Sequence, residues 1–169
     1  STIHYPQSTM LTLRKLEPTD LPYLYQWEND ANAWPSSDNH NPLSQHDLRE
    51  YIASSTGDIY KDGQLRLIIL SDGVVAGCID LFDLDIRNSK AAIGMYVAPE
   101  FRHQGIGSAA LKELEKYAFG FLHLRMLYAV TAAKNEDITH LFESARYQLS
   151  ARLTAWTIES DAFLWQKLA

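Results

Sequence analysis

The chain has 169 residues, of which 46% are hydrophobic and 21% are charged, as is usual for a globular protein. We therefore expect residues 1–169 to form a single domain. The formal net charge of −6 argues against a nucleic-acid partner, which binds to a basic face. No apolar run approaches the ~18 residues of a membrane span, and the first residues show no secretory signal, so we expect a cytoplasmic protein without membrane contact.

The cysteine and histidine counts limit the chemistry. Cys78 is the only cysteine, which excludes an intrachain disulfide and a thiolate zinc cluster. The six histidines show no metal-ligand spacing, so we predict no metal site. Because free cysteines are usually buried and no histidine is patterned beside this one, Cys78 is expected to be a core residue rather than a nucleophile.

The first third of the chain predicts a strand followed by two helices. Apolar and polar residues alternate over 10–16, as they do in a half-buried strand. Asp20 precedes apolar residues at helical spacing, which predicts a first helix with Asp20 as its cap. Residues 32–45 are rich in Pro, Asn and Ser and predict a loop, at whose end Ser44 caps a second predicted helix.

The centre of the chain changes to the periodicity of strands. Three strand-like runs cover 64–70, 74–85 and 91–98. The turns between them are shorter than the crossover of about a dozen residues that parallel neighbours need. We therefore predict that these three strands form an antiparallel meander.

The remaining chain predicts one β-α-β unit and a closing pair of strands. A helix with one apolar face leads to a strand at 125–132, which we expect to run parallel to the third strand of the meander. The residues of that apolar face are Ile106, Ala110, Leu114, Tyr117, Ala118 and Phe121. A helix over 135–145, capped by Asn135, precedes strands at 147–158 and 161–168. The predicted fold class is α+β (mixed α/β), with a central mixed, mostly antiparallel sheet of about seven strands and about four flanking helices.

The stretch "EFRHQGIGSAALKELEKYA", at 100–118, places glycines directly before a helix. A helix N-terminus exposes unpaired N–H groups and the positive end of the dipole, so it favours an anion. A nucleoside-triphosphate loop needs a lysine after its last glycine, and none follows Gly107. A loose dinucleotide pattern, "GIGSAA", is present, but it follows an antiparallel meander and lacks the acid expected roughly 20 residues later.

The run "RHQGIG", at 102–107, resembles the Arg/Gln-x-x-Gly-x-Gly/Ala signature of the GCN5-related N-acetyltransferases. The predicted order of strands and helices is similar to that family over 11–168. A second segment, "NEDITHLFESARY", resembles the family's downstream helix. Asn135, Leu141 and Glu143 match, and Tyr147 stands where the family has a phenylalanine. The start and middle of the chain are most similar to the branch that acetylates polyamines or protein N-terminal amines.

This resemblance implies a site for acetyl-coenzyme A as cosubstrate. In the family, the loop amides hold the pyrophosphate, and backbone groups of the preceding strand bind the pantetheine arm. The residues implied to contact the cofactor are Met95, Tyr96, Val97, Arg102, His103, Gln104, Gly105, Ile106, Gly107, Ser108, Asn135 and Phe142. Plainer alternatives stay open, because the glycines can shape a tight turn, Arg102 and His103 can be solvated charges, and Asn135 can be a helix cap alone.

The acceptor amine is implied to bind near the end of the first helix and the loop after it. The residues expected to bind it are Glu28, Asp30, Trp34, Asp80 and Asp83. Strand alternation places Asp83 and Asp85 on one face and Asp80 on the other. These aspartates can equally form a polar strand face at a hairpin end, and Trp34 can simply pack.

The chain departs from the family's usual chemistry in two places. Family members commonly supply an acid to the leaving thiolate from a tyrosine in the downstream helix, where this chain has Phe142. The carboxylate that many members carry on the strand at 91–98 is also absent. We therefore predict that Tyr96 or Tyr128 substitutes, or that the thiolate leaves unaided because the pKa of a thiol, roughly 8–9, is low enough.

The sequence thus predicts an acetyl-coenzyme A-dependent N-acetyltransferase for a small primary amine, with polyamines and diamines favoured. A ribosomal-protein-type N-terminal acetyltransferase and a non-catalytic coenzyme-binding module are the alternatives. A dinucleotide oxidoreductase is a more distant one. The edge strands expected late in the chain also allow a homodimer.

Overall fold

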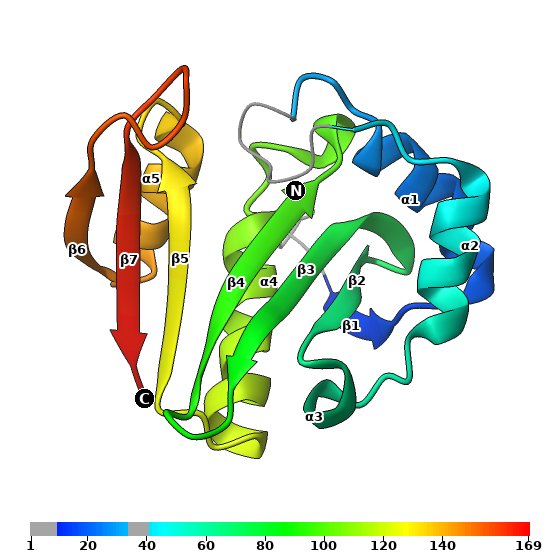
Figure 1. The fold of residues 1–169 in the computed structure, drawn as a ribbon, viewed down its shortest axis with the longest axis horizontal. Coiled ribbons are helices and arrows are strands. Elements are labelled where there is room, and N and C mark those ends of the chain that lie inside the picture. The colour runs from blue at the N-terminus through cyan, green and yellow to red at the C-terminus, as the bar shows by residue number, and fades with distance from the viewer. Residues whose placement is uncertain (1–9, 34–40) are drawn as a thin grey trace, which may run out of the picture.

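The computed structural model describes residues 10–33 and 41–169, whose strands form one seven-stranded sheet in the order β1-β2-β3-β4-β5-β7-β6 (Figure 1). The strands are β1 Leu11–Lys15, β2 Leu65–Ser71, β3 Val74–Asp85, β4 Lys90–Val97, β5 Met126–Ala132, β6 Gln148–Leu153 and β7 Ala162–Leu168. The helices are α1 Leu21–Glu28, α2 Gln45–Ser54, α3 Ile59–Asp62, α4 Ile106–Glu115 and α5 Glu136–Ser144. All neighbouring strands are antiparallel except β4 and β5, which are parallel. The predicted mixed, mostly antiparallel α+β fold is confirmed.

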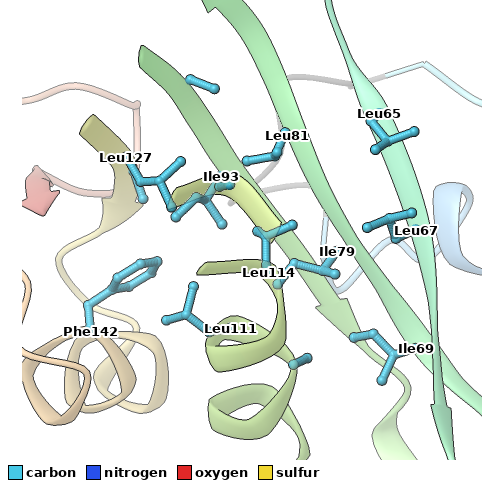
Figure 2. Packing of buried hydrophobic residues seen from close by; sticks show 14 of the residues in the cluster. Leu65, Leu67, Ile69, Ile79, Leu81, Ile93, Leu111, Leu114, Leu127 and Phe142 are labelled. Atoms are coloured by element: carbon cyan, nitrogen blue, oxygen red, sulfur yellow. The ribbon is translucent and has the colours of Figure 1, made fainter. Parts of the chain in front are cut away.

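Strand alternation builds two cores, one on each face of the sheet. Odd-numbered positions of the central strands face α4 and α5, and Figure 2 shows Ile79 beside Leu114 of α4. Even-numbered positions such as Ile68 and Cys78 face the other way and pack with Leu24 of α1. Because the side chains of a strand alternate between its faces, each central strand supplies both cores.

A buried ion pair fixes the start of α1. Asp20 is only 1% exposed, and both of its carboxylate oxygens accept hydrogen bonds from Arg14 of β1, each at 2.8 Å. The N–H of Glu17 donates to the same carboxylate at 2.8 Å. Burial raises the pKa of Asp20, but these donors outweigh burial and hold that pKa below its ordinary value. Asp20 precedes α1 as predicted, but its side chain binds Arg14 instead of capping the helix.

Two turns were not expected from the sequence. The single turn α3 is capped at its start by Asp58, whose side chain accepts from the N–H of Tyr60 at 2.9 Å, and is followed by Gly63 with φ +70°. The predicted strand at 147–158, the second-last of the chain, ends early, at Leu153. There Asp161 accepts from the N–H of Ala155 at 2.7 Å and closes a turn before β7.

The helix after the glycine loop keeps its predicted apolar face except at Phe121. Residues Lys116–Phe121 form a π-helical turn that continues α4. A π turn contains more residues than an α turn and rotates the side chains that follow it. Ala118 is buried as predicted, but Phe121 is 73% exposed, so its assignment to the core is wrong.

Gly77→Ala is expected to destabilise the protein strongly, because a Cβ at Gly77 would lie 2.1 Å from the carbonyl oxygen of Tyr96. Overpacking typically costs about 1–3 kcal/mol, and a backbone carbonyl in a sheet cannot rotate away, so we expect the upper end of that range or more. Gly94→Ala is the matched control, because its Cβ would lie 3.4 Å from the Phe82 ring, and its cost should stay below about 1 kcal/mol. Urea unfolding measures both; equal losses would contradict the close approach of β3 and β4.

Candidate functional site

An opening between β4 and β5 is the main irregularity of the sheet. The two strands pair at only three positions, Lys90 with Met126, Ala91 with Leu127 and Ala92 with Tyr128. Beyond them β5 continues along β7 while β4 continues along β3, and Figure 1 shows the two strands separating.

Backbone groups of β4 face this opening. The N–H of Ala98 donates to the carbonyl oxygen of Ala76 at 2.8 Å, on the β3 side. Because hydrogen-bonding direction alternates along an antiparallel strand, the N–H and C=O groups of Met95 and Val97 point the other way, into the opening. The strand thus presents main-chain donors and acceptors at the position where the sequence analysis expected the pantetheine arm.

The glycine loop lies at the end of β4, directly before α4. A Cβ at Gly107 would lie 2.9 Å from Leu141 of α5 and 3.2 Å from the sulfur of Met95, so this glycine lets α4 begin against both β4 and α5. Gly105 precedes the helix with φ +77°, and a Cβ there would lie within 4 Å of no other residue in 10–33 and 41–169, its chain neighbours apart. The first amides of α4 therefore adjoin open space beside β4, which fits an anion such as a pyrophosphate.

Arg102 of the loop folds back on β4. It donates from Nε to the carbonyl oxygen of Val97 at 2.8 Å, and its guanidinium lies 5.6 Å from the centre of the Tyr96 ring. Gln104 donates from its side-chain amide to the carbonyl oxygen of Glu100 at 3.1 Å, a contact within the loop. The contacts of Arg102 hold the loop against the strand, so Arg102 is more than a solvated charge.

Two other predicted cofactor contacts lie at the surface, near the start of α5. His103 Nε2 is 3.7 Å from Asp137 Oδ2, and both side chains are exposed. Asn135 caps α5 by accepting from the N–H of Ile138 at 3.2 Å. Ser108 is exposed on α4, whereas Ile106 is only 4% exposed, so only the backbone of Ile106 is available to a ligand.

Phe142 is a core residue, although it was expected to contact the cofactor. Its ring is 2% exposed, stacks at 6.0 Å from Trp165 and meets the edge of Tyr147 at 4.9 Å. In Figure 2 the ring extends from α5 toward Leu111 and Leu127. An aromatic ring packed on several sides has no face left for a ligand in this structure.

Tyr96 borders the opening on the α1 face of the sheet. Its hydroxyl donates to Asp30 Oδ2 at 2.8 Å, and its ring lies 5.7 Å from Trp27. Burial and then the hydrogen bond to Asp30 raise the pKa of Tyr96 to about 12. The structure therefore brings together Tyr96 and Asp30, two of the predicted site residues, from elements far apart in the sequence.

Tyr128 lies at the closed end of the opening, opposite Ala92. Four residues separate Ala92 from Tyr96 along β4, which is roughly 13 Å of strand. Lys90 Nζ lies 5.7 Å from the centre of the Tyr128 ring. Burial raises the pKa of the Tyr128 hydroxyl. The two predicted catalytic tyrosines are thus not brought together.

Two of the predicted acceptor acids meet at an arginine that the sequence analysis missed. Arg66 donates from Nε and Nη2 to the two oxygens of Asp80, both at 2.9 Å, and from Nη1 to Glu28 at 2.5 Å. Arg66 and Asp80 are register partners on β2 and β3. The available signal was a single charged residue inside the apolar run "LRLIIL".

The remaining acceptor predictions fall elsewhere. Asp83 is exposed, with φ +49°, within an irregularity between Phe82 and Asp85, so regular alternation cannot be extended through Asp83 and Asp85. Trp34 lies outside the described residues. Cys78 is 5% exposed beneath this cluster, and burial raises the pKa of its thiol, so its prediction as a core residue is confirmed.

Within 10–33 and 41–169, no three His, Cys, Asp or Glu side chains are grouped as a metal site would require. Nor does any helix there have the length and apolar character needed to cross a membrane.

Comparison with known proteins agrees with this geometry. Residues 10–148 match the model of the "Acetyltransferase (GNAT) domain" family. The chain is 35% identical over 131 residues to YdaF of Bacillus subtilis, provisionally named a ribosomal N-acetyltransferase, covering 75% of this chain and 71% of YdaF. It is 24% identical over 151 residues to spermidine N(1)-acetyltransferase of Escherichia coli K12, covering 88% of this chain and 78% of that protein.

Solved structures show the same fold. Spermidine N-acetyltransferase of Vibrio cholerae, solved with coenzyme A and spermine, superposes with a TM-score of 0.85 at 21% identity and covers 94% of this chain and 95% of its own. RimL, a ribosomal L7/L12 alpha-N-protein acetyltransferase solved with coenzyme A, gives a TM-score of 0.82 at 21% identity, with 96% of each chain covered. The family model, the 35% identical relative and the main-chain opening agree, so the chain belongs to the GNAT family and is an N-acetyltransferase that uses acetyl-coenzyme A.

Proposed function

We propose that this enzyme acetylates a primary amine of a diamine or polyamine. The observation that carries the proposal is the pairing of Asp30 with Tyr96 on the α1 face of β4, beside the opening. A carboxylate beside the ring of Tyr96 suits an ammonium group, which binds to both, while Trp27, only 6% exposed, packs against the Tyr96 ring from the core. The similarity to proteins named spermidine acetyltransferases supports the same class of acceptor.

The coenzyme would bind along the opening and at the start of α4. The backbone at Gly105, Ile106, Gly107 and Ser108 would hold the pyrophosphate, because open space adjoins Gly105. The main-chain groups of β4 that point into the opening would bind the pantetheine arm. The N–H of Met95 can donate to a carbonyl oxygen of a ligand bound in the opening. Acetyl-coenzyme A supplies the acetyl group as a thioester.

The side chains on the α1 face would prepare the amine. Most of an alkylamine is protonated at neutral pH, because the pKa of its conjugate acid is about 10, and only the neutral form attacks. We assign Asp30 to bind the ammonium group of the acceptor that does not react, and the attacking amine would lose its proton to solvent. Tyr96, with a pKa of about 12, keeps its proton and donates to Asp30, so it orients that carboxylate.

The same pKa bears on the leaving group. A hydroxyl with a pKa of about 12 gives up its proton to a thiolate only uphill, since a thiol has a pKa of roughly 8–9. Tyr96 is therefore a positioning residue in this proposal. Tyr128, at the closed end of the opening, has less support as a proton donor. We therefore propose that the coenzyme A thiolate leaves without a proton donor.

A ribosomal-protein-type N-terminal acetyltransferase is the second candidate. The 35% identity to YdaF favours it, as does Arg66, which binds two of the acids expected to meet a polyamine. Release of free thiol from acetyl-coenzyme A, measured with putrescine, spermidine and short peptides, separates the candidates. Faster turnover of peptides would replace the proposal, and coenzyme binding without turnover would indicate a non-catalytic module.

A homodimer through the late strands stays a prediction. β6 is an edge strand that pairs only with β7 among the described residues. The Vibrio cholerae spermidine N-acetyltransferase has been solved as a dodecamer, which is a property of that protein.

Gly105→Asp is expected to weaken coenzyme A binding at least about tenfold relative to Gly105→Asn. Both residues tolerate the left-handed backbone at φ +77° better than other side chains do, and they have nearly the same size. Only aspartate adds a negative charge where the pyrophosphate would lie. Isothermal titration with coenzyme A measures the two affinities, and equal affinities would place the pyrophosphate elsewhere.

Asp30→Asn is expected to raise the KM for putrescine at least about tenfold while the KM for acetyl-coenzyme A changes little, because only the amine loses a charged partner. Glu50→Gln, which removes an exposed carboxylate on α2, is the matched control and should change neither constant. Steady-state kinetics with each substrate varied in turn measures both values. An unchanged KM for putrescine in Asp30→Asn would remove Asp30 from the acceptor site.

The same variant should lower the pKa of Tyr96 from about 12 toward the ordinary value of about 10. Asp30 raises this pKa through its hydrogen bond and through its charge; asparagine has no charge and accepts only a weaker, neutral hydrogen bond, while the effect of burial persists. The 13C shift of the tyrosine Cζ, followed against pH and assigned with Tyr96→Phe, measures the change. An unaltered titration would show that the Tyr96–Asp30 contact is absent in solution.

A further inference from the structure

Arg66 is the centre of a compact charge network between α1 and the sheet. It binds Asp80 through two hydrogen bonds of 2.9 Å and Glu28 through one of 2.5 Å, and its guanidinium lies 5.5 Å from the centre of the Tyr51 ring. The side chains of Arg66, Glu28 and Asp80 are only 19–22% exposed. Bidentate, charge-assisted contacts of this kind are strong and geometrically fixed.

The network adjoins the proposed acceptor site. Asp80 is the register partner of Gly94 on β4, and a Cβ at Gly94 would lie 3.6 Å from Asp80 Oδ2. Cys78, two residues before Asp80, is the partner of Tyr96, so Asp80 and Tyr96 project from the same face of the sheet. Glu28 lies two residues before Asp30 at the end of α1. The acids around the site therefore fall into two groups, one at Tyr96 and one at Arg66.

A guanidinium in this position acts as a fixed cation. Arginine keeps its charge at all ordinary pH values. It holds Glu28 and Asp80, the two carboxylates that a second ammonium group of a polyamine would otherwise find next to Asp30. A second ammonium would have to displace Arg66 from three hydrogen bonds or lie against a like charge, and either is unfavourable.

We propose that Arg66 determines specificity by restricting the acceptor to amines with one further cationic group, such as a diamine; this inference rests on the proposed function. When one amine of putrescine is neutral and attacks, a single ammonium is left, and Asp30 pairs with it. Spermidine in the same state carries two ammonium groups, and the second meets Arg66.

The preference of the unmodified enzyme tests the inference directly. We expect kcat/KM for putrescine to exceed that for spermidine by at least about tenfold, because like charges brought together at a binding site oppose binding. Turnover that favours spermidine would overturn the inference and leave the proposed function intact. No turnover with either amine would overturn both.

Variants at Arg66 test its role through the ratio of kcat/KM for putrescine to kcat/KM for spermidine. Substitution of a residue with a purely structural role would leave this ratio unchanged. Arg66→Leu should shift this ratio toward spermidine by at least about tenfold, and Arg66→Lys, which keeps the charge, should retain the preference for putrescine. Arg49→Leu removes an exposed guanidinium on α2 and controls for net charge. Because burial raises the pKa of Asp80 and Arg66 opposes that rise, the comparison is made at about pH 8.5, where an acid is more fully ionised.

Loss of Arg66 removes the cation that compensates the carboxylates of Glu28 and Asp80 and can impair folding. Arg66→Leu combined with Asp80→Asn removes the bidentate pair together and keeps Glu28. We expect this double variant to shift the ratio in the same direction by a smaller amount, with the coenzyme A affinity confirming that the fold is intact. A ratio that stays at the wild-type value in a folded double variant would overturn the inference.

Discussion

The incomplete pairing of β4 with β5 is the constraint on which the candidate site depends. Only three residue pairs join the two strands, while each pairs along most of its length with its other neighbour. Main-chain groups that lose a strand partner must find another, because an unsatisfied peptide group is costly when buried. Arg102 satisfies the carbonyl of Val97, and the amide of Met95 is placed to bind a ligand. A site made of main chain depends on topology more than on the identity of side chains.

Electrostatics at the site are local and do not follow from the overall charge. The chain carries a net charge of −6, which suits a cationic substrate only in a general way. Within the site, Arg66 compensates part of the negative charge of Glu28 and Asp80, whereas Asp30 contacts a neutral tyrosine hydroxyl. The number of carboxylates near a site is therefore a poor guide to the charge that a ligand meets.

The elements of the fold could be predicted because each follows from local patterns. Alternation located the strands, turn lengths identified the meander, and the glycine loop before an amphipathic helix identified the β-α-β unit. What failed depended on contacts between distant residues or on helix geometry. The π turn exposed Phe121, an irregularity in β3 interrupted the alternation at Asp83, and the register of β2 against β3 placed Arg66 on Asp80. Register and helix type are set by packing, which a single sequence does not display.

The alternation of β4 separates the two binding tasks within one strand. The side chain of Met95 packs toward α4, that of Tyr96 turns to the acceptor face, and the backbone between them faces the coenzyme opening. Changes on the acceptor face can therefore alter the choice of amine without moving the main chain that binds the donor. Arg66 lies on that face but on β2, two strands further from the opening than β4. The residue at position 66 can thus differ between proteins that use the same coenzyme and different acceptors, because the backbone geometry of β4 does not depend on Arg66.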